Sequence, residues 1–173
     1  MTIAITAVSG QLGSIIAKSL VAKQTGIPIV GLARSPDRVQ VQGIEVRAGE
    51  YTDARAMKTA LAGVDTLLMV SLNTPPDLRT GQHQTAISAA KEAGVRRIVY
   101  TSVQGAEEGT AFSPVNQSNR LTDTDLKASG MEWTLGRNGI YIEPDIESID
   151  RYVQAGGIEN SAGDGRCGDP GDS

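Results

Sequence analysis

The chain of 173 residues is long enough for one domain with a single compact core. A single cysteine excludes an internal disulfide, and a single histidine excludes a histidine-rich zinc cluster, so we expect no bound metal. The net charge of −4 does not favour nucleic acid as a partner. The sequence has no apolar run near the roughly 18 to 20 residues of a membrane span and no signal-peptide pattern, so we expect a soluble, cytoplasmic protein.

Apolar periodicity predicts alternating strands and helices along the chain. Segments such as TLLMVS and RRIVYTS are typical of parallel strands covered on both faces, and Gly94 and Gly130 are placed to end helices. We therefore predict a doubly wound α/β sheet of the Rossmann type with about six strands. The predicted strands are Ile3–Thr6, Pro28–Ala33, Ile44–Ala48, Thr66–Ser71, Arg96–Ser102 and Glu132–Arg137; the predicted helices are Gln11–Lys23, Ala54–Ala62, Thr80–Ala93 and Val115–Ser129.

The first helix is expected to bury one apolar face. The residues predicted on that face are Leu12, Ile15, Ile16 and Leu20.

A glycine-containing turn, TAVSGQLG, joins the first strand to the first helix. Such a turn binds pyrophosphate because the helix start presents unpaired N–H groups and glycines let phosphates approach the backbone. Gly10 would permit that approach and Gly13 would allow close packing of helix on strand. Ala7 occupies the tight-turn position, where an alanine can serve if its φ is negative. The alternative is that the glycines simply make a turn.

The end of the second predicted strand distinguishes the two nicotinamide cofactors. Proteins that bind NAD usually place an acid there, whereas this sequence has Arg34, whose guanidinium suits a 2′-phosphate. Arg38 could assist, although Asp37 lies beside it, and a solvated surface charge is the alternative for Arg34. After the third strand, Glu50 and Tyr51 stand where an adenine-contacting acid would fall.

The turn and Arg34 are followed in order by AGEYTD, AAKEAGVRRIVYTS and SGMEWTLGRNGIYIE. With these segments, the chain from Thr2 to about Gly168 resembles the NmrA-like, atypical short-chain dehydrogenase/reductase family. Within that family it is most similar to the NAD(P)H-binding quinone oxidoreductase type. The resemblance implies a Rossmann domain that binds NADPH in preference to NADH. It also implies hydride transfer to a small-molecule acceptor, such as a quinone or a related aromatic compound.

The resemblance also assigns roles to individual residues. The pyrophosphate would lie on the turn bounded by Ala7 and Gly13, and Arg34 would meet the 2′-phosphate. The remaining assignments are Ser9, Gly10, Gln11 and Leu12 at the pyrophosphate, Ser71 and Leu72 at the ribose, Thr101 and Ser102 at the nicotinamide, and Asn138 and Tyr141 beside the substrate.

Three features depart from the family pattern. Ala7 replaces the usual first glycine, and Asn119 stands where many quinone reductase relatives carry a histidine. Relatives also continue well beyond the point where this chain ends. We therefore expect residues 1–155 to form the Rossmann domain and the glycine-rich, acidic segment 156–173 to be a disordered remnant of a missing C-terminal lobe.

The sequence has no Tyr-x-x-x-Lys pair, which many short-chain reductases use as an acid. Its absence disfavours carbonyl reduction and epimerisation but permits quinone reduction, in which the cofactor supplies the chemistry. His83 is expected to have a packing or hydrogen-bonding role, and Cys167 to be an exposed thiol. A non-catalytic NADP(H) redox sensor and an inactive truncated fragment stay open as alternatives, and the chain is compatible with a homo-oligomer.

Overall fold

The computed structural model describes residues 1–105, 114–139 and 149–155. It divides into two units, Met1–Gly139 and Ile140–Ser173. In the second unit only helix α6, Ile149–Ala155, is described. The acidic segment 156–173, Tyr141 and Cys167 lie outside the described residues.

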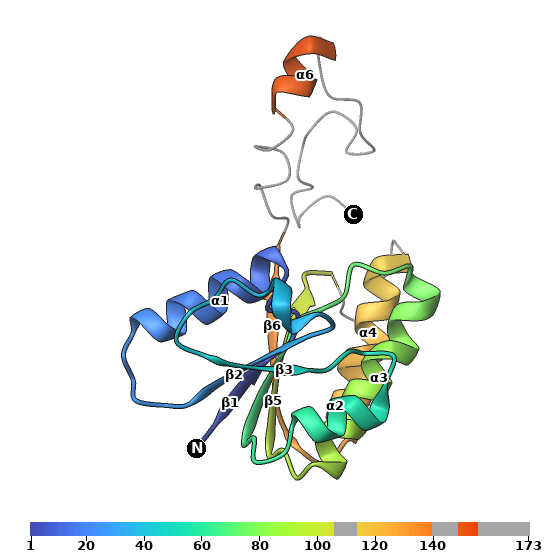
Figure 1. The fold of residues 1–173 in the computed structure, drawn as a ribbon. Coiled ribbons are helices and arrows are strands. Elements are labelled where there is room, and N and C mark those ends of the chain that lie inside the picture. The colour runs from blue at the N-terminus through green and yellow to red at the C-terminus, as the bar shows by residue number, and fades with distance from the viewer. Residues whose placement is uncertain (106–113, 140–148, 156–173) are drawn as a thin grey trace. The chain divides into compact units, whose positions relative to one another are not determined.

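The first unit is built on six parallel strands in the order β3-β2-β1-β4-β5-β6 (Figure 1). This is the doubly wound Rossmann arrangement, and the predicted fold class is confirmed. The strands are β1 (Ile3–Ile5), β2 (Ile29–Ala33), β3 (Glu45–Ala48), β4 (Thr66–Met69), β5 (Arg97–Val103) and β6 (Glu132–Asn138).

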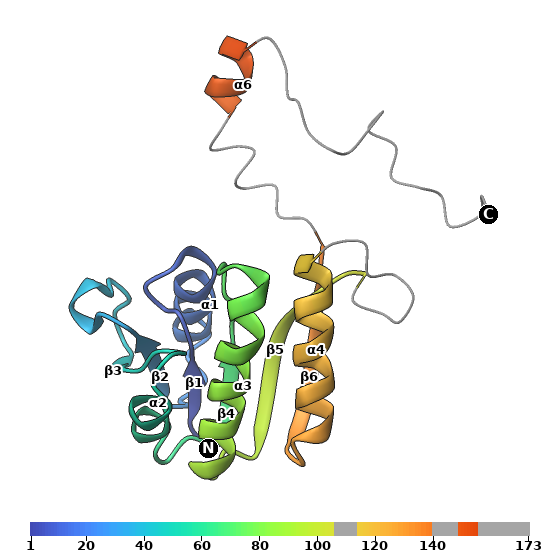
Figure 2. The same cartoon turned by 90° about the vertical axis from the view of Figure 1, so that its right-hand side faces the viewer.

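Helices cover both faces of the sheet. Helix α1 lies on one face and α2, α3 and α4 lie on the other (Figure 2). A short 3-10 turn, η1, replaces a helix between β2 and β3. The bounds are α1 (Gln11–Ala22), η1 (Pro36–Arg38), α2 (Ala54–Ala60), α3 (Pro76–Glu92) and α4 (Pro114–Ala128).

The core consists of two apolar clusters, one on each side of the sheet. The larger lies under α2, α3 and α4 and includes Met57, Leu67 and Ile98, all fully buried. The smaller packs under α1 around Ile5 and Ala17. Because the strands run parallel, the carboxyl ends of β1 to β4 lie at one edge of the sheet.

Every predicted strand and helix is present, and the bounds differ by at most two residues except at the start of α3. Helix α3 begins at Pro76 rather than Thr80, because proline is well tolerated in the first turn of a helix. The predicted apolar face of α1 is wrong at Ile15, whose side chain is 51% exposed. The helix instead buries Gly13 and Ala17, so its closest approach to the sheet uses small residues.

The helix ends behave as predicted. Gly94 and Gly130 follow α3 and α4 with φ of 82° and 79°, the left-handed conformation that ends a helix. Among the described helices, none is long and apolar enough to cross a membrane. Cytoplasmic location and homo-oligomer formation stay predictions from the sequence.

Candidate functional site

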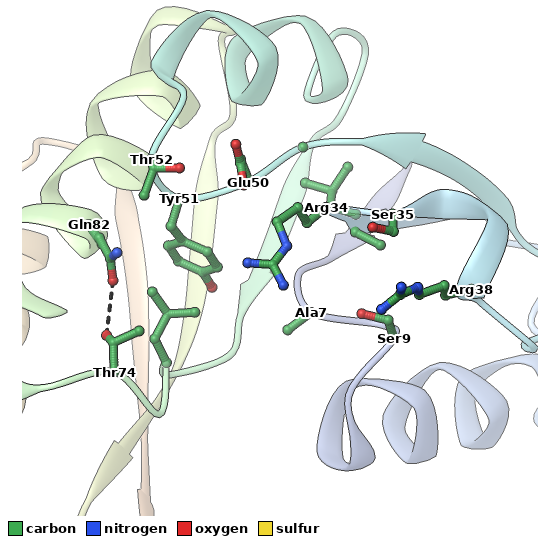
Figure 3. A pocket seen from close by; sticks show the side chains of 14 residues that line it. Ala7, Ser9, Arg34, Ser35, Arg38, Glu50, Tyr51, Thr52, Thr74 and Gln82 are labelled. Atoms are coloured by element: carbon green, nitrogen blue, oxygen red, sulfur yellow. Dashed lines mark hydrogen bonds between the residues drawn. The ribbon is translucent and has the colours of Figure 1, made fainter. Parts of the chain in front are cut away.

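A pocket of about 260 Å³ opens at the carboxyl ends of β1, β2, β3 and β4 (Figure 3). Strands β1 and β4 are neighbours there, and the chain leaves them toward opposite sides of the sheet. Ligands of open α/β sheets bind at this topological switch point. The lining residues are Ala7, Ser9, Leu32, Ala33, Arg34, Ser35, Arg38, Gly49, Glu50, Tyr51, Thr52, Leu72, Thr74 and Gln82.

The turn after β1 is held by close packing at Gly13. A Cβ on Gly13 would lie 2.4 Å from the carbonyl oxygen of Ala7 and 2.9 Å from that of Thr6. Because both neighbours are backbone atoms, neither can move aside cheaply. The predicted role of Gly13 in packing helix on strand is therefore confirmed.

The backbone of Ala7 differs from the sequence expectation. Its φ is +54°, in the left-handed region, whereas we expected an alanine to be tolerated there through a negative φ. The turn keeps this conformation because the Ala7 carbonyl accepts a hydrogen bond from Gly10 N–H at 2.9 Å and the Val8 N–H is bound to the Leu32 carbonyl at 3.2 Å. The site thus carries the backbone strain that a glycine would avoid.

The start of α1 suits an anion. Gly10 caps the helix without a side-chain hydrogen bond, and the first turn contains no acidic residue. The N–H groups of a helix start and the positive end of its dipole favour phosphate. Ser9, immediately before the cap, is exposed and lines the pocket.

Two arginines form the cationic side of the pocket. Arg34 follows β2, and the η1 turn brings Arg38 to the same side (Figure 3). Neither guanidinium pairs with a carboxylate of the described residues. Asp37 lies between them in sequence but does not line the pocket. Arg34 and Arg38 therefore keep their charge available to a ligand.

Tyr51 contributes its ring to the pocket rather than its hydroxyl. The Tyr51 hydroxyl donates to the Val70 carbonyl at 2.6 Å, and so Thr6 Oγ1, 2.6 Å away, donates to the Tyr51 oxygen. Thr6 Oγ1 in turn accepts from Val70 N–H at 2.8 Å. Burial raises the pKa of Tyr51 above its ordinary value, against the smaller effect of the Thr6 hydrogen bond. The hydroxyl is therefore a structural link and stays protonated.

His83, on α3, holds the loop after β4 in place through a hydrogen bond. Its Nε2 accepts from Leu72 N–H at 3.2 Å, so Nδ1 carries the proton and donates to Thr122 Oγ1 at 2.9 Å. Thr122 donates onward to the Ser118 carbonyl at 3.0 Å. Burial, with a smaller effect from the nearby Arg79 charge, lowers the pKa of His83 to about 4. The expected hydrogen-bonding role is confirmed.

Asn119 occupies the position where the resemblance places a histidine. It is buried, and its Oδ1 accepts from the Tyr100 hydroxyl at 2.5 Å while its Nδ2 donates to the Val115 carbonyl at 2.9 Å. Burial is the main cause that raises the pKa of Tyr100 to about 12. These groups orient one another and hold no proton that is mobile near neutral pH.

Most of the residues that the resemblance assigns to the ribose, the nicotinamide and the substrate lie outside the pocket lining. Thr101 accepts from Ser71 N–H at 2.8 Å, whereas Ser102 is fully buried. Asn138 ends β6, where its carbonyl accepts from Gln104 N–H at 2.8 Å. The pocket lining includes Leu72 but none of Ser71, Thr101, Ser102 and Asn138.

Four pocket residues with polar side chains were not predicted from the sequence: Ser35, Thr52, Thr74 and Gln82. Three of them could have been found, because each directly follows a strand or its loop at the carboxyl edge of the sheet. Gln82 lies within α3 and carries no local signal.

The sequence model described as NAD(P)H-binding matches residues 8–163. The chain belongs to this family. Quinone oxidoreductase 2 of Escherichia coli is 38% identical over 169 residues, which cover 95% of this chain and 57% of that protein. An NmrA-like family domain-containing oxidoreductase of Aspergillus flavus is 29% identical, over 80% of this chain and 48% of that protein. This chain therefore spans about half the length of these relatives.

Solved structures show the same similarity. Triphenylmethane reductase of Citrobacter sp., complexed with NADP(H), superposes with a TM-score of 0.84 at 30% identity, over 94% of this chain and 58% of that one. The NADPH-dependent quinone oxidoreductase of Escherichia coli, complexed with NADPH, gives 0.76 at 36% identity, over 90% and 55%. The resemblance inferred from the sequence motifs is confirmed.

Replacing Ala7 with glycine is expected to raise the free energy of unfolding by about 1 kcal/mol, because glycine adopts positive φ without strain. Gln24, whose φ is +47°, gives a positive control: Gln24→Gly should stabilise by a similar amount. Ser19→Gly, at an exposed site inside α1, should destabilise instead. Urea denaturation measures all three, and a loss of stability in Ala7→Gly would contradict the assigned strain.

Lowering the pH from 7 to 4 is expected to cost about 3 kcal/mol of stability through His83 alone. The pKa of His83 is about 4 in the folded chain and 6.5 by ordinary value, so the unfolded chain binds the proton first as pH falls. His83→Gln should remove this component. Urea denaturation at both pH values compares the two proteins; an equal pH dependence would show that His83 is not held neutral.

Proposed function

We propose that this chain is the dinucleotide-binding part of an oxidoreductase that binds NADP(H) in this pocket. The observation that carries the proposal is that Arg34 and Arg38 lie on one wall of the pocket and the uncapped start of α1 lies beside it. The arginines in the pocket and the helix start next to Ser9 are two separate anion-binding features, as a dinucleotide with a 2′-phosphate requires. Membership in the NAD(P)H-binding family supports the same ligand class.

The residues present fit this cofactor. The N–H groups of the first turn of α1 and the Ser9 hydroxyl would hold the pyrophosphate. Arg34, Arg38 and Ser35 would hold the 2′-phosphate, since the position after β2 carries no acid to bind the ribose hydroxyls of NAD instead. We infer from this charge pattern that NADPH binds more tightly than NADH.

NADPH, when bound, supplies a hydride. The tyrosines and the histidine described near the pocket supply no acid for the acceptor: the Tyr51 and Tyr100 hydroxyls are bound to buried partners, and His83 is neutral. A quinone suits such a site, since hydride addition gives a hydroquinone anion that takes its proton from water. Reduction of a quinone or a related aromatic acceptor is therefore the proposed reaction of the whole protein, and the similar quinone oxidoreductase of Escherichia coli supports it.

A non-catalytic NADP(H) sensor is the second candidate. The same lack of an acid favours it, because a sensor needs only the binding site. NADPH oxidation in the presence of a panel of quinones separates the two: turnover favours the oxidoreductase, and binding without turnover favours the sensor or an inactive piece of a longer enzyme.

The wild-type chain is expected to prefer NADPH over NADH by about 10- to 150-fold, the equivalent of about 1.5 to 3 kcal/mol for charge-assisted hydrogen bonds. Arg34→Ala should remove most of this preference and leave NADH affinity nearly unchanged. Arg55→Ala is the matched control, because Arg55 is exposed and lies outside the pocket. Calorimetric titration measures the affinities, and equal wild-type affinities would contradict the proposal.

A further inference from the structure

The pocket has two chemically different ends. Arg34 and Arg38 make one end cationic, whereas Leu72, Thr74 and Gln82 make the other uncharged. Tyr51 lies between Arg34 and Gln82 (Figure 3). Glu50 lies near Tyr51, so the pocket suits a ligand with a phosphate at the arginine end and an uncharged group that can donate hydrogen bonds at the other.

In the structure the amide of Gln82 turns its oxygen toward Thr74. The Thr74 hydroxyl donates to Gln82 Oε1 at 2.9 Å, so Oε1 faces the loop after β4 (Figure 3). Among the described residues, none accepts a hydrogen bond from Gln82 Nε2. The Nε2 amino group is therefore a donor left for a ligand.

The loop that orients this amide is itself held in place. The Thr74 carbonyl accepts from the buried guanidinium of Arg79 at 2.8 Å, and the Leu72 N–H is bound to His83. Both anchors come from α3, which also carries Gln82. The Thr74–Gln82 pair is consequently preorganised, and a ligand need not order it on binding.

The surroundings of Gln82 Nε2 suit a flat heterocycle. Tyr51, which is 7% exposed and whose hydroxyl is bound to Val70 and Thr6, lines the pocket together with the apolar side chain of Leu72. In NADP(H) the 2′-phosphate is carried by the ribose of the adenosine half. If Arg34 holds the 2′-phosphate, the adenine base on the same ribose lies one sugar away from the cationic end of the pocket.

We propose that Gln82 is a specificity-determining residue that reads the adenine base, donating from Nε2 to the ring nitrogen N1. This inference rests on the proposed binding of NADP(H) and adds the residue that selects the base. Adenine N1 is an acceptor, whereas N1 of hypoxanthine carries a hydrogen and is a donor. A donor at Gln82 thus favours adenine and leaves hypoxanthine facing an unmatched N–H.

The test is calorimetric titration with NADPH and with its hypoxanthine analogue, deamino-NADPH. The wild-type chain should bind NADPH about tenfold more tightly than the analogue. Gln82→Leu should bring the ratio close to one by weakening NADPH. Gln82→Glu should reverse the preference, because a carboxylate accepts from the N1–H of hypoxanthine.

Gln84→Leu is the matched control. Gln84 is two residues away on α3, exposed, bonded to Asp125 and outside the pocket, so this variant should keep the wild-type ratio. Circular dichroism verifies folding of each variant. If Gln82→Leu does not fold, the wild-type ratio and its reversal in Gln82→Glu decide.

Two outcomes overturn the inference and differ from each other. The first is that the wild-type chain binds NADPH and the analogue equally, or that Gln82→Glu keeps the wild-type ratio. Either result would show that Gln82 does not recognise the base, and would not affect the proposed binding of the 2′-phosphate by Arg34. A wild-type chain that binds no NADPH overturns both the base recognition and the proposed function.

Discussion

The contact between Gly13 and the backbone of Ala7 is the constraint on which the candidate site depends. With no room for a side chain at Gly13, helix α1 begins directly against the end of β1. This approach directs the uncapped N–H groups of α1 toward the carboxyl edge of the sheet, where the pocket lies. The positive φ of Ala7 accompanies this close packing.

Buried polar side chains then hold the remaining walls. The Thr6–Tyr51–Val70 hydrogen bonds join β1, the loop after β3 and the end of β4, while His83 fixes the loop that follows. Such groups stabilise the fold only when their hydrogen bonds are satisfied, and here both the Tyr51 hydroxyl and the His83 ring are fully engaged. The functional consequence is a pocket whose walls are set before a ligand arrives.

Local patterns were enough to predict the strands, the helices and Arg34 at the cationic end of the pocket. Gly10, Gly13 and Arg34 can be recognised because each lies in a short segment that follows a strand. The parallel strands covered on both faces can be recognised by their nearly continuous apolar sequences. The uncharged end was not predictable in this way. The Gln82–Thr74 bond depends on the rotation of α3, and Tyr51 meets Thr6 across 45 residues of sequence.

The exposure of Ile15 has a similar origin, since periodicity alone cannot say that α1 packs through Gly13 and Ala17 instead. The φ of Ala7 likewise follows from the hydrogen bonds between Ala7 and Gly10 and between Val8 and Leu32 rather than from the residue type. Tertiary packing therefore decided the details that the sequence pattern left out.

Backbone amide chemical shifts of the ¹⁵N-labelled chain, recorded as NADPH is added, test the central claim most directly. The account predicts the largest shifts at the turn and first helical turn, Ser9 to Leu12, and at Arg34 and Ser35 after β2. Shifts centred on the groove between α3 and α4, near Ser88, Lys91 and Asp125, or no shifts at all, would contradict it.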